Sequence, residues 1–275
     1  MLGYRVTDWD DAYENTQNIP GGDAWPEKWV APAAKFRDDM AGSSTLDIAY
    51  GQSERQRLDV FRPNGASRGL LVFVHGGYWA RLDKSFFSHM ASGAVAAGYT
   101  AALPSYDLCP TVRVADITGE IGRAVTKAAE MVDGPIHIAG HSAGGHLVSR
   151  MMCTDAPLDG AVRTRLKSVT SISGLHDLRP IMRLERNTGL GIDEAEAQAE
   201  SPALLAPQTG VRLVCWVGAM ERAEFLRQNA LLANIWRGLG ATTDVVEEPD
   251  RHHFDVIDGL TDPRSPLMRA VLGGA

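Results

Sequence analysis

The chain has 275 residues, of which 44% are hydrophobic and 22% charged, as is typical of a soluble globular protein. Its formal net charge of −7 argues against nucleic acid or an anionic membrane as a partner, because both attract basic surfaces. No stretch approaches the roughly 18 uninterrupted apolar residues of a membrane span, and the first residues lack a signal-peptide pattern, so we expect a cytoplasmic protein without a membrane partner.

The cysteine content gives no sign of a disulfide or metal framework. Cys109, Cys153 and Cys215 are odd in number, far apart and in or beside apolar runs, and no C-x-x-C pair occurs. We therefore expect three reduced and mostly buried thiols.

The first part of the chain, residues 1–45, is polar and rich in glycine and proline, and we expect it to be irregular. It holds Trp25 and Trp29 beside Pro26 and Pro32. Because large aromatic side chains must be buried somewhere, this segment is predicted to pack on the main body rather than to form a free tail. Residues 46–275 are predicted to form one structural domain with it.

From Leu46 onward, apolar runs alternate with segments of helical periodicity. This alternation predicts an α/β protein with a mostly parallel, doubly wound sheet. The predicted strands are Leu58–Phe61, Gly69–Val74, Thr100–Leu103, Ile136–Ala139, Ser168–Ile172, Leu213–Val217 and Thr242–Val246. The predicted helices are Ser85–Ala97, Val114–Val132, Ala143–Cys153 and Ala223–Leu239.

The pattern loosens between Leu175 and Pro207 into short helical pieces that carry charge. An excursion of this kind between strands often forms a lid or a pocket wall. Its acidic stretch Asp193–Glu196 is equally consistent with a solvated surface helix.

The most informative motif is Gly140-His141-Ser142-Ala143-Gly144, between the apolar run Ile136–Ala139 and a predicted helix. A G-x-S-x-G sequence at a strand-to-helix turn resembles the nucleophile elbow of α/β-hydrolases. Small residues flank the serine there because the turn is sharp. Ser142 is therefore the candidate nucleophile, and the alternative is a glycine-rich helix start that binds an anion.

A serine nucleophile of this kind needs a histidine base after the last strand. Only His252 and His253 lie there, and spacing alone does not choose between them. His141 adjoins the serine and is expected to point away from it.

The orienting acid is expected after the penultimate strand, Leu213–Val217. Glu221 lies where the loop leaves that strand and is the preferred candidate. Glu224 falls in the first turn of the next helix, where an acid also favours the helix dipole. Asp177 follows the preceding strand and is the third choice, with a helix N-cap as its structural alternative.

The sequence His75-Gly76-Gly77-Tyr78-Trp79 follows the strand that ends at Val74. Lipases and esterases carry an HGGG-type loop here, whose backbone N–H groups bind the substrate oxyanion. Gly77 and Tyr78, with Ala143 after the serine, are the predicted oxyanion donors. His75, Gly76 and Trp79 are predicted to form the motif around the substrate pocket. Trp79 and Tyr78 are expected to form its aromatic wall, and packing in the core is the alternative for either of them.

Together these motifs resemble the kynurenine formamidases (arylformamidases) of the α/β-hydrolase type. The resemblance rests on the H-G-G-x-W loop and on matching stretches in register, namely Ala139–Leu147, Ser173–Pro180, Glu224–Gln228 and His253–Ile257. If the roles of the family's residues are carried over to the matching positions, the resemblance implies that Ser142 is the nucleophile and His253 the base. The family acid is usually an aspartate in a G-x-x-D loop, and Glu221 occupies that position here.

The resemblance implies a cofactor-free serine hydrolase with a small-molecule substrate, in which Ser142 attacks a formamide or ester carbonyl. N-formylkynurenine is the expected substrate, carboxylesterase activity is the alternative, and a non-catalytic binding protein with the same fold is the third reading. The metal-dependent formamidase class carries an H-x-G-T-H-x-D motif that is not found in this sequence, so no metal is implied. A homodimer is compatible with the sequence.

Overall fold

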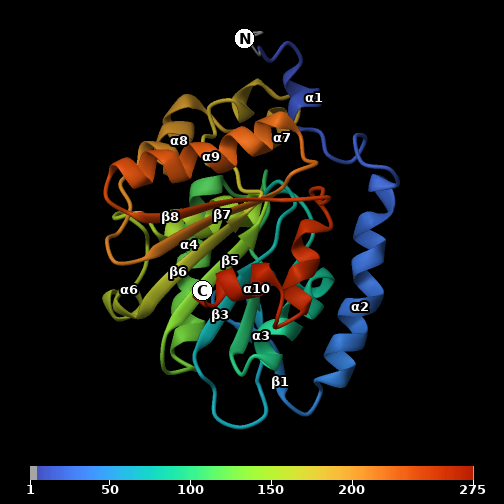
Figure 1. The fold of residues 1–275 in the computed structure, drawn as a ribbon, viewed down its shortest axis with the longest axis vertical. Helices are drawn as coiled ribbons and strands as arrows, with labels where there is room; N and C mark the ends of the chain where they lie inside the picture. Colours follow the sequence, from blue (N-terminus) through green and yellow to red (C-terminus); the bar gives the residue numbers. More distant parts are fainter. Residues whose placement is uncertain (1–4, 275) are drawn as a thin grey trace.

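An eight-stranded mixed sheet forms the centre of the computed structural model, which describes residues 5–274 (Figure 1). β1 pairs antiparallel with β2 and β2 antiparallel with β4, whereas all later pairs are parallel. The predicted mostly parallel α/β sheet is confirmed. In their order across the sheet the strands are β1 (Ser44–Ala49), β2 (Arg57–Phe61), β4 (Thr100–Pro104), β3 (Leu70–Val74), β5 (Ile136–His141), β6 (Leu166–Ile172), β7 (Arg212–Gly218) and β8 (Thr242–Glu248).

Burial along the strands explains which of them the sequence revealed. Every residue of β3, β4 and β5 is buried, as expected for strands covered on both faces, and their apolar runs are continuous. β1 was not predicted because it is an edge strand, polar and mostly exposed, with an irregularity at Asp47 (φ 58°). Its sequence therefore lacks an apolar pattern.

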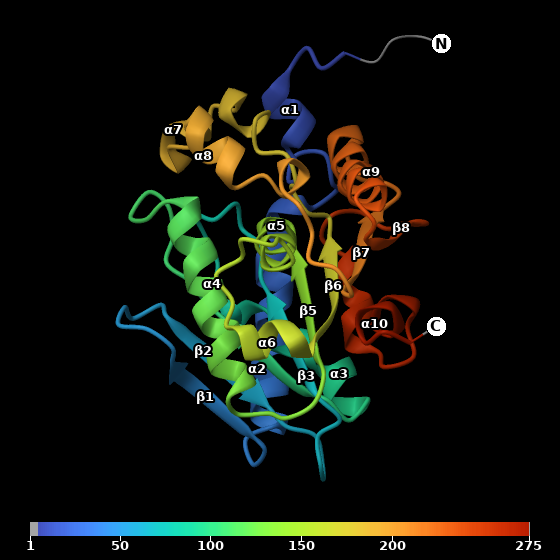
Figure 2. The ribbon, with the colours of Figure 1, turned by 90° about the vertical axis from the view of Figure 1, so that its left-hand side faces the viewer.

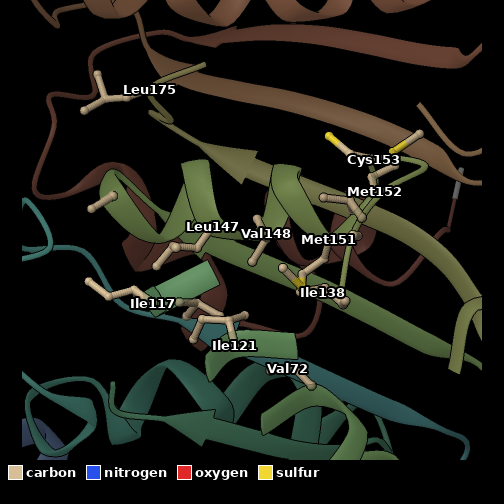
Figure 3. Packing of buried hydrophobic residues seen from close by; sticks show 14 of the residues in the cluster. Val72, Ile117, Ile121, Ile138, Leu147, Val148, Met151, Met152, Cys153 and Leu175 are labelled. Atoms are coloured by element: carbon tan, nitrogen blue, oxygen red, sulfur yellow. The ribbon is translucent and has the colours of Figure 1, made fainter. Parts of the chain in front are cut away.

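Helices cover both faces of the sheet, with α4 on one side and α3 and α10 on the other in Figure 2. Figure 3 shows Ile117 and Ile121 of α4 facing Leu147 and Val148 of α5, with Ile138 of β5 next to Met151 in the same cluster. No helix of residues 5–274 is both long and apolar enough to cross a membrane. The helices are α1 (Trp9–Tyr13), α2 (Trp25–Asp39), α3 (Ser92–Ala96), α4 (Val114–Ala129), α5 (Ala143–Met151), α6 (Gly160–Arg165), α7 (Asn187–Leu190), α8 (Glu194–Ala199), α9 (Ala223–Gly238) and α10 (Pro266–Val271).

The predicted single helix over Ser85–Ala97 is wrong. The segment forms three short pieces instead, 3-10 turns at Lys84–Phe86 and Ser88–Ala91 followed by α3. Phe87 separates the first two with a non-helical backbone (φ −118°, ψ 8°). Its ring is buried against Trp29, so tertiary packing overrides the helical periodicity.

The predicted irregular N-terminal segment is wrong as well, because α1 and α2 lie within it. Pro26 is in the first turn of α2, where its missing N–H is not needed for an intrahelical bond. Pro32 lies inside the helix, and because it has no backbone N–H one intrahelical hydrogen bond is missing there. Trp29, on the same helix, is buried against Phe87 and Phe254, and this packing holds α2 on the body.

Candidate active site

Ser142 lies at a sharp turn between the end of β5 and the start of α5. Its backbone has φ 56° and ψ −118°, a strained conformation for a residue with a side chain. The flanking glycines are required by close approach: a Cβ on Gly140 would lie 2.3 Å from the carbonyl oxygen of Gly144, and one on Gly144 would lie 2.1 Å from that of Val74. The predicted strand-to-helix turn therefore holds the serine side chain at the carboxyl end of the sheet.

His253 and Glu221 meet at the ends of two neighbouring strands. The His253 Nδ1 lies 2.7 Å from Glu221 Oε2, and both side chains are buried. The other oxygen, Oε1, accepts hydrogen bonds from the backbone N–H of Gly218 (2.9 Å) and the hydroxyl of Ser173 (2.5 Å). A carboxylate at Nδ1 favours the tautomer that carries its proton there, which leaves His253 Nε2 free to accept a proton.

Ser142 and His253 line the same cavity. Within residues 5–274 no hydrogen bond joins the two side chains. Bonds between a nucleophile and its base are often long before substrate binds and tighten in the complex. The cavity is thus where a reacting carbonyl group would meet both side chains.

The alternative residues have other partners. Glu224 accepts the hydroxyl of Tyr13 (2.9 Å) and the guanidinium of Arg227 (3.0 Å), which ties α1 to α9. Asp177 pairs with Arg179 (2.8 Å). His252 Nδ1 accepts the backbone N–H of the residue two positions on (3.1 Å). Of the open choices, the geometry brings together His253 and Glu221.

The loop after β3 contacts the serine. A Cβ on Gly76 would lie 3.0 Å from the Ser142 Cβ. Gly77 and Tyr78 follow with positive φ values of 117° and 51°, and within the described residues their N–H groups have no acceptor. Ala143 opens α5, where a helix leaves its first N–H groups without an internal partner. Gly77 and Tyr78 line the cavity with Ser142, and Ala143 is next to the serine, so the three amide groups remain candidate donors to an oxyanion.

His75 and Trp79 do not line the cavity, so their predicted place in the substrate pocket is wrong. Trp79 is fully buried behind it, and its Nε1–H donates to His146 Nδ1 (3.2 Å) because a buried indole N–H needs an acceptor. His75 stacks between Phe87 and Tyr106 in the core. Their neighbours Gly76 and Tyr78 do line the cavity.

The N-terminal segment forms one wall of this cavity, which the sequence did not reveal. Glu14, Asn15 and Trp29 are among its lining residues. The Tyr78 hydroxyl donates to the carbonyl of Tyr13 (2.6 Å), so the loop after β3 and the wall are directly linked. No sequence pattern signalled this contact, because it joins residues 65 positions apart.

The excursion over residues 175–207 is not the pocket wall, and that prediction is wrong for this cavity. None of its described residues lines the cavity. It supports the wall from behind, since Arg186 pairs with Glu14 (2.9 Å) and covers the Tyr78 ring at 4.0 Å from the centroid. The backbone N–H of Glu185, just before α7, also donates to Asp10 of α1 (2.8 Å), and Figure 1 shows α7 near α1. The N-terminal segment therefore lines the cavity where residues 175–207 were expected to do so.

His141 also lines the cavity. Because a carbonyl can only accept, its Nε2–H donates to the backbone oxygen of His253 (2.8 Å). Burial, with the nearby His253, lowers the pKa of His141 well below its usual value, so the ring is neutral. It is therefore a positioning residue for the loop that carries His253.

Several buried histidines predict a loss of stability in acid. Burial lowers the pKa of His75 to about 4 and those of His146 and His176 to about 3. Because these values lie below that of an unfolded histidine, the unfolded state binds more protons between about pH 6.5 and 4. The free energy of unfolding is therefore expected to decrease as the pH is lowered through that window, by up to about 1.4 kcal/mol per pH unit for each histidine.

Urea unfolding at pH 7.0 and 5.0 measures this slope. The matched variant is His75→Phe, whose ring can keep the stack between Phe87 and Tyr106. It is expected to show a shallower pH dependence than the parent protein. Equal slopes for the two proteins would contradict the assignment of His75 as a buried neutral group.

Comparisons with known proteins agree with this architecture. A family model described as the alpha/beta hydrolase family matches residues 71–272. The chain is 28% identical to a kynurenine formamidase from Salmo salar, over 82% of this chain and 80% of that protein, which confirms the resemblance stated above. The solved structure of a thioesterase candidate from Silicibacter sp. TM1040 is 43% identical, with a TM-score of 0.92, over 97% of this chain and 100% of that one.

A more distant solved structure shares the fold alone. It is an esterase from Pyrobaculum calidifontis, 16% identical with a TM-score of 0.70, and the match covers 96% of both chains. The overall fold described above is therefore common to this chain and to a protein of very different sequence.

Proposed function

The chain belongs to the alpha/beta hydrolase family, and on that premise we propose that it is a serine hydrolase of aryl formamides such as N-formylkynurenine. The observation that carries this proposal is the His253–Glu221 pair at 2.7 Å, with His253 on the wall of the cavity that Ser142 also lines. The similarity to kynurenine formamidases supports the choice of a formamide.

In the proposed mechanism, Ser142 Oγ attacks the formyl carbon while His253 Nε2 takes the hydroxyl proton. Glu221 stabilises the resulting imidazolium. The N–H groups of Gly77, Tyr78 and Ala143 bind the oxyanion, and each contributes roughly 3–4 kcal/mol to the transition state.

The C–N bond then breaks as His253 returns the proton to the departing aryl amine. The formyl group stays on Ser142 as an ester. Water, deprotonated by His253, attacks this ester and releases formate, which restores the serine hydroxyl. No step requires a group beyond the residues named and water.

Ester hydrolysis is the second candidate, and the 43% identity to a thioesterase candidate favours it. The same residues serve both reactions, and the leaving group decides between them. An aryl amine is a better leaving group than an alkyl amine, so formanilides and aryl esters are within reach of one site.

The substrate proposal predicts that kcat/KM for N-formylkynurenine exceeds or approaches the values for p-nitrophenyl acetate and for the corresponding thioester, p-nitrophenyl thioacetate. A spectrophotometric assay of all three substrates on the same enzyme preparation tests this. A preference of about a hundredfold or more for either ester, which corresponds to about 2.7 kcal/mol, would make ester hydrolysis the better assignment. Failure of a fluorophosphonate probe to label Ser142 would instead favour a non-catalytic binding protein.

A further inference from the structure

The N-terminal wall of the cavity carries hydrogen-bond donors that the protein itself does not use. Asn15 and Trp29 line the cavity and are only 5% and 4% exposed. Within the described residues, neither the Asn15 Nδ2 nor the Trp29 Nε1 has a hydrogen-bond partner. Buried donors are almost always paired, so two unpaired ones on one cavity indicate a ligand that supplies acceptors.

A cation lies on the same cavity. Arg81 is exposed, and in the part of the chain that the structure describes its guanidinium forms neither an ion pair nor a hydrogen bond. Its backbone N–H donates to the carbonyl of Gly77 (3.1 Å), which anchors it to the oxyanion loop. A positive charge beside unpaired N–H donors suits an anionic oxygen ligand.

The acidic residues of this wall do not remove that preference. Glu14 already pairs with Arg186 at 2.9 Å, and its other oxygen accepts the backbone N–H of Thr16 at 2.7 Å. Asp23 is exposed, so water and salt screen its charge. The unused groups on the wall are therefore mainly donors.

We propose that Asn15, Trp29 and Arg81 form a subsite that binds a carboxylate on the leaving-group side of the substrate. The inference rests on the proposed hydrolase function and adds to it a determinant of specificity. The carboxylate oxygens would accept from the Asn15 amide and the Trp29 indole, and Arg81 would supply the opposite charge. A substrate bound in this way extends from Ser142 to the N-terminal wall.

The test compares N-formylkynurenine with its carboxamide, which keeps the aryl formamide but lacks the negative charge. Formate release is measured for the wild type and for Asn15→Leu, Trp29→Phe and Arg81→Met. Each variant is expected to lower kcat/KM for the carboxylate substrate about tenfold or more, mainly through KM, with a much smaller loss for the carboxamide. Gln17→Leu, at an exposed position outside this cavity, is the control and should change neither value.

Equal losses for the two substrates, or no loss for the carboxylate, would overturn the subsite. Trp29→Phe keeps an aromatic ring and Arg81→Met changes an exposed side chain, so both variants are expected to fold, which their unfolding midpoints check.

A second readout separates the subsite from the proposed reaction. Kynurenine should slow fluorophosphonate labelling of Ser142 more than kynuramine, which lacks the carboxylate, and Arg81→Met should abolish that difference. Labelling without formate release would refute the formamide substrate alone. If kynurenine and kynuramine slow labelling equally, the carboxylate subsite is refuted, whereas the proposed serine hydrolase function is not.

Discussion

Replacing Ser142 with alanine is expected to lower kcat for formamide hydrolysis by about six orders of magnitude. The size of the loss follows from the joint action of nucleophile and base, since removing either one disables the pair. Steady-state formate release and fluorophosphonate labelling measure it, and labelling should disappear as well. Ser149→Ala is the matched control, because this serine lies in the helix that follows Ser142 and, within residues 5–274, its hydroxyl bonds only the carbonyl of Gly145. Residual activity above about one-thousandth of the wild type in Ser142→Ala would remove this serine from the mechanism.

Replacing Glu221 with glutamine is expected to lower kcat about 10³- to 10⁴-fold. The amide would lack the charge that stabilises the imidazolium of His253, and it could present an N–H to Nδ1 and so favour the wrong tautomer. The pH dependence of kcat is measured alongside, because a purely structural role for Glu221 would leave its profile unchanged.

The comparison variant for this prediction is Glu224→Gln. Glu224 bonds the Tyr13 hydroxyl and Arg227, so its loss should lower the free energy of unfolding by about 1–3 kcal/mol and leave kcat near the wild-type value. The opposite pattern, with activity lost in Glu224→Gln and retained in Glu221→Gln, would transfer the orienting role to Glu224.

Local patterns made the centre of the molecule predictable. β3 and β5 are buried on both faces, so their apolar runs are continuous in the sequence. The turn at Ser142 needs glycine at positions 140 and 144 for steric reasons, and the sequence displays both. A structural feature that depends on only a few consecutive residues can therefore be predicted from the sequence.

The remaining features depend on contacts between distant segments. His252 and His253 are neighbours in the chain, and only the fold decides which of them reaches Glu221. The same holds for Trp79, whose indole faces a core histidine rather than the cavity. The wall formed by Asn15 and Trp29 has no sequence signal, because polar residues and prolines there also fit an irregular segment.

The order of the chain places the N-terminal part of the proposed subsite, Asn15 and Trp29, on a different stretch from the residues proposed to break the bond. The wall lies entirely before β1, while Ser142, Glu221 and His253 follow later strands. Tyr13 joins the two parts through its contacts with Tyr78 and Glu224. Substitutions in residues 14–29 are therefore expected to shift which compounds are accepted without altering the residues proposed to break the bond, so divergence among relatives in this region would mark changes of substrate rather than of reaction.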